Sequence, residues 1–288
     1  MLRDRDLRGY GELKALIIAA GRGERFRPFT DENPKCLVPL LGRPLIERVI
    51  LAVREAGIRD FVVVTGYLGE KLRGALGDGE RYDVSIEYVE NRRWRMGNGV
   101  SVYVARELID ENFVLLMSDH VFNPEILCEL QRHGTRGDEC VLCVDTQMSY
   151  VFDMEDATKV QVDGDRILRI GKNLREYNGV DMGIFLCSSV LFDALGKSIR
   201  RGLYSLTDAI RELADEERMK ACCFDDDEYY WIDVDTPRMG KIAESILPIL
   251  EAESAFRGTL RERLIMEPPR RLQARTFPGP FFSERRGN

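Results

Sequence analysis

Short apolar runs recur along the first half of the chain, separated by stretches in which apolar and polar residues mix. Four runs are nearly continuous and have the length of strands, at 14–20, 61–65, 113–117 and 140–146, and a fifth alternates between apolar and polar residues, at 84–89. Continuous runs of this length are typical of strands buried on both faces of a parallel sheet, whereas alternation is typical of a strand with one exposed face.

Segments in which apolar residues recur at helical spacing lie between these runs. They cover 45–56, 70–76, 100–108 and 124–133, and Gly57 ends the first of them. A chain in which strands and helices alternate predicts an α/β fold. We expect a mostly parallel central sheet, flanked by helices and joined by right-handed crossovers.

Residues 150–190 depart from this alternation. The sequence KVQVDGDRILRIG is typical of a β-hairpin with its turn at Asp163 and Gly164, and another strand-like run follows at 183–187. We expect this β-rich insertion to form a lid or a wall beside the main sheet.

The C-terminal part opens with a helix signal. Thr236 can cap a helix and Pro237 suits the first helical position, so we expect a helix that runs to about residue 266. The predicted organisation is an N-terminal extension at 1–13, one domain at 14–246 that contains the insertion, and a C-terminal helix with a tail at 247–288.

The composition adds little to this picture but excludes some functions. The chain has 288 residues, of which 44% are hydrophobic and 32% are charged, as in an ordinary soluble globular protein. Its net charge of −7 disfavours a nucleic-acid partner. The chain contains 34 Arg and only 8 Lys, a bias that indicates either a heat-adapted source or a GC-rich genome.

The seven cysteines predict a reduced protein. Cys140 and Cys143 form a CxxC pattern, but they lie in a strand-like run, so their side chains should point to opposite faces, and no second metal-binding pair follows. The first residues lack the hydrophobic core of a signal peptide, and no run reaches the ~18 apolar residues that span a bilayer. We therefore expect a cytoplasmic protein.

The most informative stretch follows the first apolar run. Gly21 and Gly23 come directly after a buried strand, where glycines let backbone N–H groups approach a phosphate, and Arg25 can bind phosphate oxygens with both guanidinium arms. A dinucleotide-binding loop is the alternative, but position 26 is Phe and no acidic residue ends the run at 61–65. The Walker-type phosphate loop is also absent.

Acidic residues follow two other strand-like segments. Asp119 comes just after the run at 113–117, and Asp233 and Asp235 would share one face of a strand at 231–235. Carboxylates at the carboxyl end of a parallel sheet can bind Mg²⁺, which prefers oxygen ligands. The alternative is that Asp235 or Asp233 caps the helix that follows.

These segments together resemble a known family. The combination AAGxGxRxxPxT, followed by PK, resembles the signature of nucleotidyltransferases that join a nucleoside triphosphate to a sugar or alcohol phosphate. The further segments GNGxS, MSDH, DATKV, IGKxLxxYNxVDxGIF and WIDVDTP make the chain most similar to CTP:inositol-1-phosphate cytidylyltransferases. The resemblance extends from about Lys14 to Ile246 and implies the Rossmann-like nucleotide-diphospho-sugar transferase fold.

The resemblance implies a Mg²⁺-dependent enzyme that joins CTP and 1L-myo-inositol 1-phosphate into CDP-inositol and pyrophosphate. Two alternatives remain open: a phosphocholine cytidylyltransferase or sugar-1-phosphate nucleotidyltransferase, and a non-catalytic regulatory module of the same fold. Regulatory relatives typically lose the charged residues of the site, whereas this chain keeps Arg25, Lys35, Asp119 and Asp233. The implied product leads to di-myo-inositol phosphate, a solute of heat-adapted organisms, which agrees with the arginine bias.

The resemblance also implies roles for single residues. It assigns the loop that holds the triphosphate to Ala19, Gly21, Arg22 and Gly23. It assigns the cations beside the reacting phosphates to Arg25 and Lys35. It assigns the Mg²⁺ ligands to Asp119, Asp233 and Asp235.

Base and acceptor are assigned to later segments. Gly97 and Asn98 lie where the family contacts the base; Asn98 has both a donor and an acceptor for a pyrimidine, and it could equally cap a helix. Lys172 matches the lysine that meets the acceptor phosphate, or it is a solvated charge on the hairpin. Asp181 could accept hydrogen bonds from acceptor hydroxyls, and Gly183 would leave room for the acceptor ring.

His120 is expected to be a satisfied histidine beside the metal site rather than a general base. The attacking phosphate is already an anion, so alignment and charge neutralisation can carry the reaction.

The tail at 268–288 carries five Arg and one Glu and contains Phe277, Phe281 and Phe282. It is either an unstructured terminus or a segment that associates with an anionic membrane or a membrane enzyme. Relatives often carry a fused membrane domain, so we expect a stand-alone form or a fragment, as a monomer or a dimer.

Overall fold

The computed structural model describes residues 13–148, 151–226 and 228–266. Its centre is a nine-stranded sheet in the order β5-β4-β1-β6-β11-β8-β12-β10-β9. The strands of this sheet are β1 Lys14–Ile18, β4 Asp60–Thr65, β5 Ser85–Glu90, β6 Phe113–Met117, β8 Cys140–Asp145, β9 Lys159–Asp163, β10 Arg166–Gly171, β11 Gly179–Cys187 and β12 Met219–Phe224. Two small sheets consist of β2 Pro39–Leu40 with β3 Arg43–Pro44, and of β7 His120–Phe122 with β13 Trp231–Asp233.

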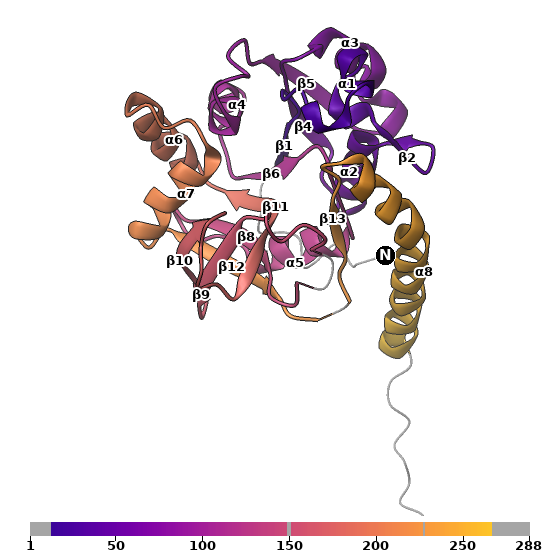
Figure 1. The fold of residues 1–288 in the computed structure, drawn as a ribbon. Helices are drawn as coiled ribbons and strands as arrows, with labels where there is room; N and C mark the ends of the chain where they lie inside the picture. Colours follow the sequence, from indigo (N-terminus) through magenta and orange to yellow (C-terminus); the bar gives the residue numbers. More distant parts are fainter. Residues whose placement is uncertain (1–12, 149–150, 227, 267–288) are drawn as a thin grey trace, which may run out of the picture.

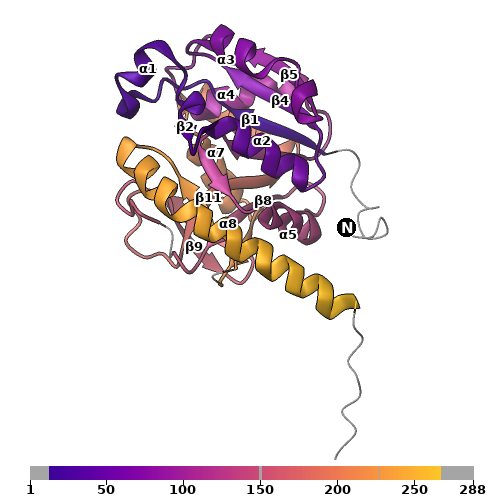
Figure 2. The ribbon, with the colours of Figure 1, turned by 90° about the vertical axis from the view of Figure 1, so that its right-hand side faces the viewer.

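Helices cover both faces of this sheet, as Figures 1 and 2 show. They are α1 Phe29–Glu32, α2 Leu45–Glu55, α3 Gly69–Leu76, α4 Asn98–Tyr103, α5 Glu125–His133, α6 Val190–Arg200, α7 Leu206–Asp215 and α8 Pro237–Met266. Short 3-10 turns lie at Glu24–Phe26, Lys35–Leu37, Glu80–Tyr82 and Val104–Glu107. The strands and helices predicted in the first half of the chain are confirmed to within a few residues, although the segment at 100–108 continues as a 3-10 turn after α4.

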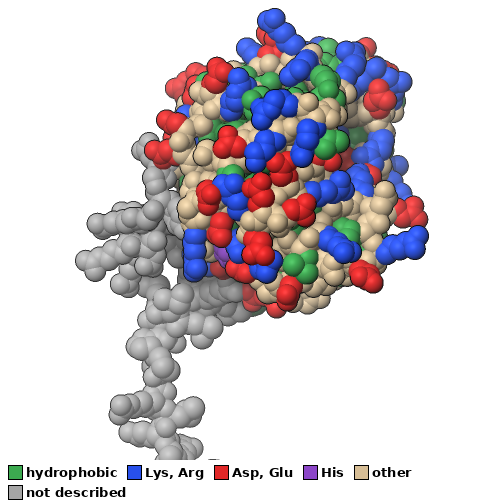
Figure 3. Space-filling model, turned by 90° about the vertical axis from the view of Figure 1, so that its left-hand side faces the viewer, with side chains coloured by type: hydrophobic (Ala, Val, Ile, Leu, Met, Phe, Trp, Pro, Cys, Tyr) green, Lys and Arg blue, Asp and Glu red, His purple; other side chains and the backbone are tan. Residues whose placement is uncertain are grey.

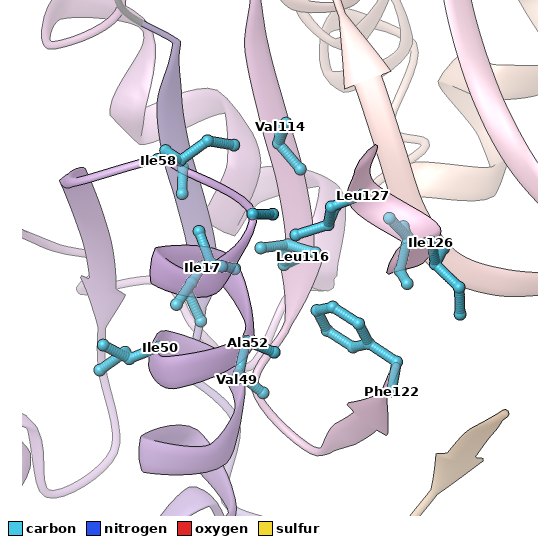
Figure 4. Close-up of a cluster of buried hydrophobic side chains, with 14 of the residues drawn as sticks. Ile17, Val49, Ile50, Ala52, Ile58, Val114, Leu116, Phe122, Ile126 and Leu127 are labelled. Atoms are coloured by element: carbon cyan, nitrogen blue, oxygen red, sulfur yellow. The ribbon is translucent and has the colours of Figure 1, made fainter. Parts of the chain in front are cut away.

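The two faces of the sheet have separate cores. Side chains alternate across a strand, so Ile17 of β1 packs in the cluster with α2, α3 and α5, while Leu16 packs in the cluster with α4, α6 and α7. Figure 4 shows the first of these clusters, in which Val49 of α2 and Ile126 of α5 meet the side chains of β1 and β6. Cys143 lies in the first cluster and Cys140 in the second, which confirms that the CxxC pair points to opposite faces.

The sheet is mixed rather than mostly parallel. The strands β5, β4, β1 and β6 are parallel to one another, but β11 runs antiparallel to both of its neighbours, β6 and β8. The predicted hairpin of β9 and β10 forms, with its turn between Asp163 and Arg166. It does not form a separate lid, because β10 pairs with β12 and β9 pairs with β11, so the hairpin extends the main sheet.

The small sheet of β7 and β13 and the start of α8 lie over a third core cluster. Thr236 Oγ1 accepts a hydrogen bond from the backbone N–H of Met239 at 3.2 Å, which confirms Thr236 as the cap of α8. Ala243 and Leu247 of α8 are fully buried against Ile232 and Val234, whereas Phe256, farther along the helix, is 66% exposed. Figure 2 shows α8 crossing the molecule and projecting beyond it.

Some expectations fall outside the described residues, namely the N-terminal extension up to residue 12 and the tail at 268–288. No helix in the part of the chain that the structure describes is long and apolar enough to cross a membrane. On the face in Figure 3, basic and acidic side chains are interspersed, with no extended basic patch on that face.

Candidate active site

Two pockets meet at the carboxyl ends of β1 and β6. The loop pocket is lined by residues of the glycine loop and of the segment before α4, including Ala19, Gly21, Gly23, Lys35, Trp94, Gly97 and Ser101. The acidic pocket is lined by residues of β11, β13 and the hairpin region, including Asp156, Lys172, Asp181, Gly183 and Asp233. Both pockets share Asn98, Met117, Asp119 and Asp235, so these residues mark the seam between them.

The small antiparallel sheet brings the acidic residues together. Because β7 pairs with β13, His120 lies opposite Asp233, and the backbone N–H of Val234 donates to the carbonyl oxygen of Asp119 at 3.1 Å. Possible ligand atoms of Asp119, His120 and Asp233 all lie within 4.8 Å of one another. The strand ends at Asp233, so the expectation of one strand face shared by Asp233 and Asp235 is wrong.

Asp233 and Asp235 have different surroundings. Asp233 Oδ1 is buried and has no hydrogen-bond partner among the described residues, although His120 Nε2 lies 3.5 Å away. Burial, with the negative charges of Asp119 and Asp235 adding to it, raises the pKa of Asp233 to about 7. Asp235 instead forms ion pairs with Lys35 and Arg25. The cap of α8 is Thr236 rather than either acid.

Lys35 lines the loop pocket and bonds to two residues of the seam. Its ammonium group donates to Asp119 Oδ2 at 2.5 Å and to Asp235 Oδ1, and the residue is only 9% exposed. Burial by itself would lower the pKa of Lys35, but the charges of Asp119 and Asp235 outweigh burial and raise it above the ordinary value. The lysine is therefore firmly protonated and held in place.

Arg25 connects Asp235 with Asp156, which lines the acidic pocket. Its guanidinium donates to Asp235 Oδ2 at 2.5 Å and to Asp156 Oδ2 at 2.8 Å, and Asp156 also accepts a hydrogen bond from Lys172. The three cations expected from the sequence, Lys35, Arg25 and Lys172, are thus joined by two carboxylates. Sequence reasoning missed Asp156, whose only signal was its place in the DATKV segment.

Carboxylate oxygens at the seam fit a divalent cation. Asp119 and Asp233 offer oxygen ligands, and the unpartnered Oδ1 of Asp233 is a buried acceptor that a cation would satisfy.

His120 is positioned as expected beside this acidic cluster. Its Nδ1 lies 2.8 Å from the carbonyl oxygen of Met182, so Nδ1 carries the proton and donates it, and Nε2 faces Asp233. Burial lowers the pKa of His120, but the charges of Asp233 and Asp119 outweigh it and raise the pKa above its ordinary value.

Gly183, which lines the acidic pocket, makes room for His120. A Cβ atom on Gly183 would lie 2.4 Å from His120 Nδ1, and the backbone there has a left-handed φ of +71°. Asp181 lines the acidic pocket, and its Oδ1 accepts from the backbone N–H of Gly183 at 2.7 Å. Burial raises the pKa of Asp181 to about 6.

Asn98 begins α4, and its side chain makes no cap for that helix, so the expectation of a cap there is wrong. Its Oδ1 accepts from the backbone N–H of Leu206, the first residue of α7, at 2.8 Å. Gly97 has a φ of +152°, and a Cβ on it would lie 2.5 Å from the carbonyl oxygen of Tyr204. Both residues therefore hold the segment before α4 against the start of α7.

Arg22 points away from the pockets. Its guanidinium lies 5.2 Å from the ring centre of Tyr67 and 3.2 Å from Asp31 Oδ1. Ala19 and Gly21 do line the loop pocket, so the structure brings together the predicted loop residues except for the side chain of Arg22.

Comparison with known proteins explains this arrangement. The family described as nucleotidyl transferase matches residues 14–239, most of the chain. The chain belongs to the nucleotidyl transferase family. The match covers the main sheet, both pockets and the start of α8, and it confirms the family and the α/β fold expected from the sequence.

Relatives within the nucleotidyl transferase family include two bifunctional IPC transferase and DIPP synthase proteins. That of Rubrobacter xylanophilus is 36% identical over 235 residues, which cover 81% of this chain and 51% of the relative. That of Aquifex aeolicus is 33% identical over 224 residues, which cover 77% and 49%. The chain therefore spans about half the length of these curated relatives.

A solved structure of the inositol-1-phosphate CTP transferase from T. maritima has a similar fold. It superposes with a TM-score of 0.72 and 26% sequence identity, and the match covers 84% of this chain and 97% of that one.

Proposed function

We propose that this protein is a Mg²⁺-dependent cytidylyltransferase that joins CTP and 1L-myo-inositol 1-phosphate into CDP-inositol and pyrophosphate. The observation that carries the proposal is the position of Lys35, a buried ammonium group between Asp119 and Asp235 where the two pockets meet. A cation at this place can contact phosphates bound in either pocket and offset negative charge where the new bond forms. The names of the relatives and of the T. maritima structure supply the substrates.

The loop pocket receives the nucleotide and the acidic pocket receives the acceptor. Backbone N–H groups at Gly21 and Gly23 approach the triphosphate, Lys172 meets the acceptor phosphate, and Asp181 accepts hydrogen bonds from acceptor hydroxyls. The phosphate contacts of Arg25 and Lys172 replace the ion pairs that Asp156 makes with them.

The reaction needs no proton transfer. An oxygen of the acceptor phosphate attacks the α-phosphorus of CTP, a new P–O bond forms, and the bond from the α-phosphorus to the bridging oxygen breaks. The electron pair leaves with pyrophosphate. Lys35 and Arg25 hold the phosphates in line and offset charge as it builds on the leaving group.

Mg²⁺ would be held by Asp119 and Asp233. It would neutralise negative charge on the phosphates, and the family's use of a divalent cation suits the carboxylate oxygens found here. His120 does not act as a base. Its hydrogen bond to the carbonyl oxygen of Met182 fixes the orientation of its ring beside these acids.

The names of the relatives combine two activities in one longer chain, and this chain corresponds to about half of that length. We assign it the IPC transferase step, which supplies CDP-inositol to a DIPP synthase activity. All seven cysteines are free thiols, which suits a reducing cytoplasm.

Pyrophosphate release tests the proposal directly. The protein is incubated with Mg²⁺, each of the four ribonucleoside triphosphates, and one of three acceptors: inositol 1-phosphate, phosphocholine or glucose 1-phosphate. We expect the highest rate with CTP and inositol 1-phosphate, and a loss of at least about 100-fold in the Asp119→Asn variant with unchanged folding. Turnover on another acceptor, with none on inositol 1-phosphate, would place the protein in a different branch of the family. Binding of a nucleotide without pyrophosphate release for any pair of nucleotide and acceptor would support the regulatory alternative.

A further inference from the structure

Asp145 is a buried carboxylate at the end of β8 that the proposed reaction does not use. It is 6% exposed, and no cationic side chain in the described ranges forms an ion pair with it. Its oxygens accept from two neutral donors instead. Oδ2 accepts from Trp231 Nε1 at 2.9 Å, and Oδ1 accepts from the backbone N–H of Met148 at 2.7 Å. Burial of a carboxylate is costly unless its oxygens are hydrogen-bonded, so both donors hold Asp145 in this place.

The two donors belong to two walls of the acidic pocket. Trp231 lines this pocket and is the first residue of β13. Met148 precedes the segment 151–158, most of which lines the same pocket, Asp156 included. Asp145 itself lines neither the acidic pocket nor the loop pocket, so it can act on the site only through these two donors.

The side chains of Trp231 and Asp233 lie on the same side of β13. Side chains alternate along a strand, and Ile232 between them packs in the third core cluster, whereas Trp231 packs in the first. Both Trp231 and Asp233 line the acidic pocket. A displacement of β13 at Trp231 would therefore carry the carboxylate of Asp233 with it.

The attachment of β13 to the main sheet depends on side chains. The strand has three residues and pairs with β7, which also lies outside the nine-stranded sheet. Among the described residues, two side-chain hydrogen bonds join this small sheet to the main one. His120 Nδ1 donates to the carbonyl oxygen of Met182 in β11, and Trp231 Nε1 donates to Asp145 in β8. The bond to Asp145 is the one that holds β13.

We propose that Asp145 is a positioning residue of the active site. Through Trp231 it places Asp233 for the divalent cation. Through Met148 it places the wall of the acidic pocket that carries Asp156. The inference rests on the proposed function and adds to it a residue that touches neither substrate nor cation. Neither donor lines the loop pocket, so the binding of CTP should not depend on Asp145.

Asp145→Asn tests the inference at nearly constant side-chain size. The amide keeps one oxygen, so its NH₂ group would face one of the two donors and that hydrogen bond would be lost. At saturating Mg²⁺ we expect kcat to fall and KM for inositol 1-phosphate to rise, each about five- to tenfold, while KM for CTP stays within about twofold. Equal increases in both KM values would overturn the inference, because the effect would not be confined to the acidic pocket.

Mg²⁺ binding can be measured without turnover. The chain contains two tryptophans, so its NMR spectrum has two indole N–H resonances, and Trp94→Phe identifies that of Trp231. This resonance should shift when Mg²⁺ alone is added. In Asp145→Asn it should move already in the metal-free protein, and the Kd for Mg²⁺ should rise about tenfold. An unchanged Kd, or a Trp231 resonance that responds neither to Mg²⁺ nor to the substitution, would overturn the inference.

A double-mutant cycle shows whether Asp145 acts through the indole. Trp231→Phe removes the donor and keeps an aromatic ring, so it also tests the same hydrogen bond if Asp145→Asn does not fold. The readout is the Mg²⁺ concentration for half-maximal pyrophosphate release. If both residues act through one bond, the second substitution should add at most about twofold to the effect of the first. Effects that multiply fully would overturn the proposed role of Trp231.

Gln131→Met is the matched control for the loss of a buried hydrogen bond. Gln131 Nε2 donates to the carbonyl oxygen of Ala56 at 3.0 Å, and neither residue lines the acidic pocket or the loop pocket. The substitution should lower the melting temperature but leave the Mg²⁺ requirement and both KM values unchanged. The same kinetic changes in Gln131→Met as in Asp145→Asn would overturn the inference, because lost stability alone would explain them.

Failure of this inference can be told apart from failure of the proposed function. Weaker Mg²⁺ binding in Asp145→Asn, with no turnover of inositol 1-phosphate by the unsubstituted protein, would keep the positioning role and reject the acceptor. Turnover of inositol 1-phosphate by the unsubstituted protein, with unchanged Mg²⁺ binding and KM values in Asp145→Asn, would keep the proposed function and reject the positioning role.

Discussion

Gly23 lies directly against the stem of Lys35. A Cβ on Gly23 would come within 2.4 Å of Lys35 Cβ, and the glycine adopts a left-handed φ of +66°. Two features therefore require glycine at position 23. The backbone conformation is one that only glycine adopts easily, and any larger side chain would collide with Lys35.

The Gly23→Ala variant should lose activity because Lys35 cannot keep its place between Asp119 and Asp235. We expect a decrease of at least about 100-fold in kcat and a free energy of unfolding lower by about 1–3 kcal/mol. Gly74→Ala is the control, since Gly74 lies in α3 with open space around it and should gain about 0.5–1 kcal/mol. Urea unfolding and pyrophosphate release measure both effects. A fully active Gly23→Ala protein would show that the position of Lys35 does not matter.

Asp233 and Asp235 should respond differently to amide substitution. Asp233→Asn removes a buried negative charge suited to a cation, so the Mg²⁺ concentration for half-maximal rate should rise at least about tenfold, while the melting temperature without metal should not fall. Asp235→Asn removes an ion-pair partner from both Lys35 and Arg25, so it should lower the melting temperature without metal.

The comparison is made by titrating Mg²⁺ in the pyrophosphate assay and by thermal unfolding in chelator. If Asp235→Asn alone shifted the Mg²⁺ requirement, the metal ligand would be Asp235 and the assignment to Asp233 would be wrong.

Asp156→Asn should strengthen substrate binding rather than weaken it. The carboxylate occupies Arg25 and Lys172, which the substrate phosphates need, so its removal should lower KM for both CTP and inositol 1-phosphate by about two- to fivefold. Stability should barely change, because the side chains of Arg25 and Lys172 are about half exposed and such pairs contribute about 0.2–1 kcal/mol.

Glu217→Gln, which breaks the exposed pair with Arg166 away from both pockets, should leave both KM values unchanged. A higher KM for both substrates in Asp156→Asn would mean that Asp156 positions the two cations instead of competing for them.

Asp181→Asn should stabilise the protein at neutral pH but not in acid. The carboxyl of Asp181 has a pKa of about 6 in the folded protein and about 3.9 when unfolded, so the folded state binds the proton more tightly. Stability of the wild type therefore falls as pH rises from about 4 to 6. Above that range it is lower by about 2–3 kcal/mol than it would be without the shift.

An amide keeps the acceptor for the N–H of Gly183 and carries no charge. Urea unfolding at pH 4 and pH 8 should show a gain for Asp181→Asn only at pH 8, and the same difference at both values would contradict the assignment.

Much of the fold could be predicted because the burial of each strand or helix determines its local pattern of apolar and polar residues. The strands β1, β4, β6 and β8 are buried on both faces, so they read as continuous apolar runs. The central position of β11 could not be predicted, because its pairing with β6 joins segments about 70 residues apart and no local pattern specifies the partner.

The same limit applies within the site. Lys35, Asp119 and the loop glycines could be found because they lie in dense motifs. Asp156 could not, because its partner Arg25 is 131 residues away. The requirement for glycine at position 183 is also non-local, because the space that a side chain there would need is occupied by the ring of His120, on another strand.

The pairing of β13 with β7 has a consequence for the order in which the protein matures on the ribosome. Asp119 is synthesised more than one hundred residues before Asp233, yet the two acids become neighbours only when β13 adds to β7. The sheet can begin to assemble from the nascent chain well before that moment. The site is therefore completed almost last, and a chain that ended before Trp231 would keep all nine strands of the main sheet but would lack Asp233 and Asp235.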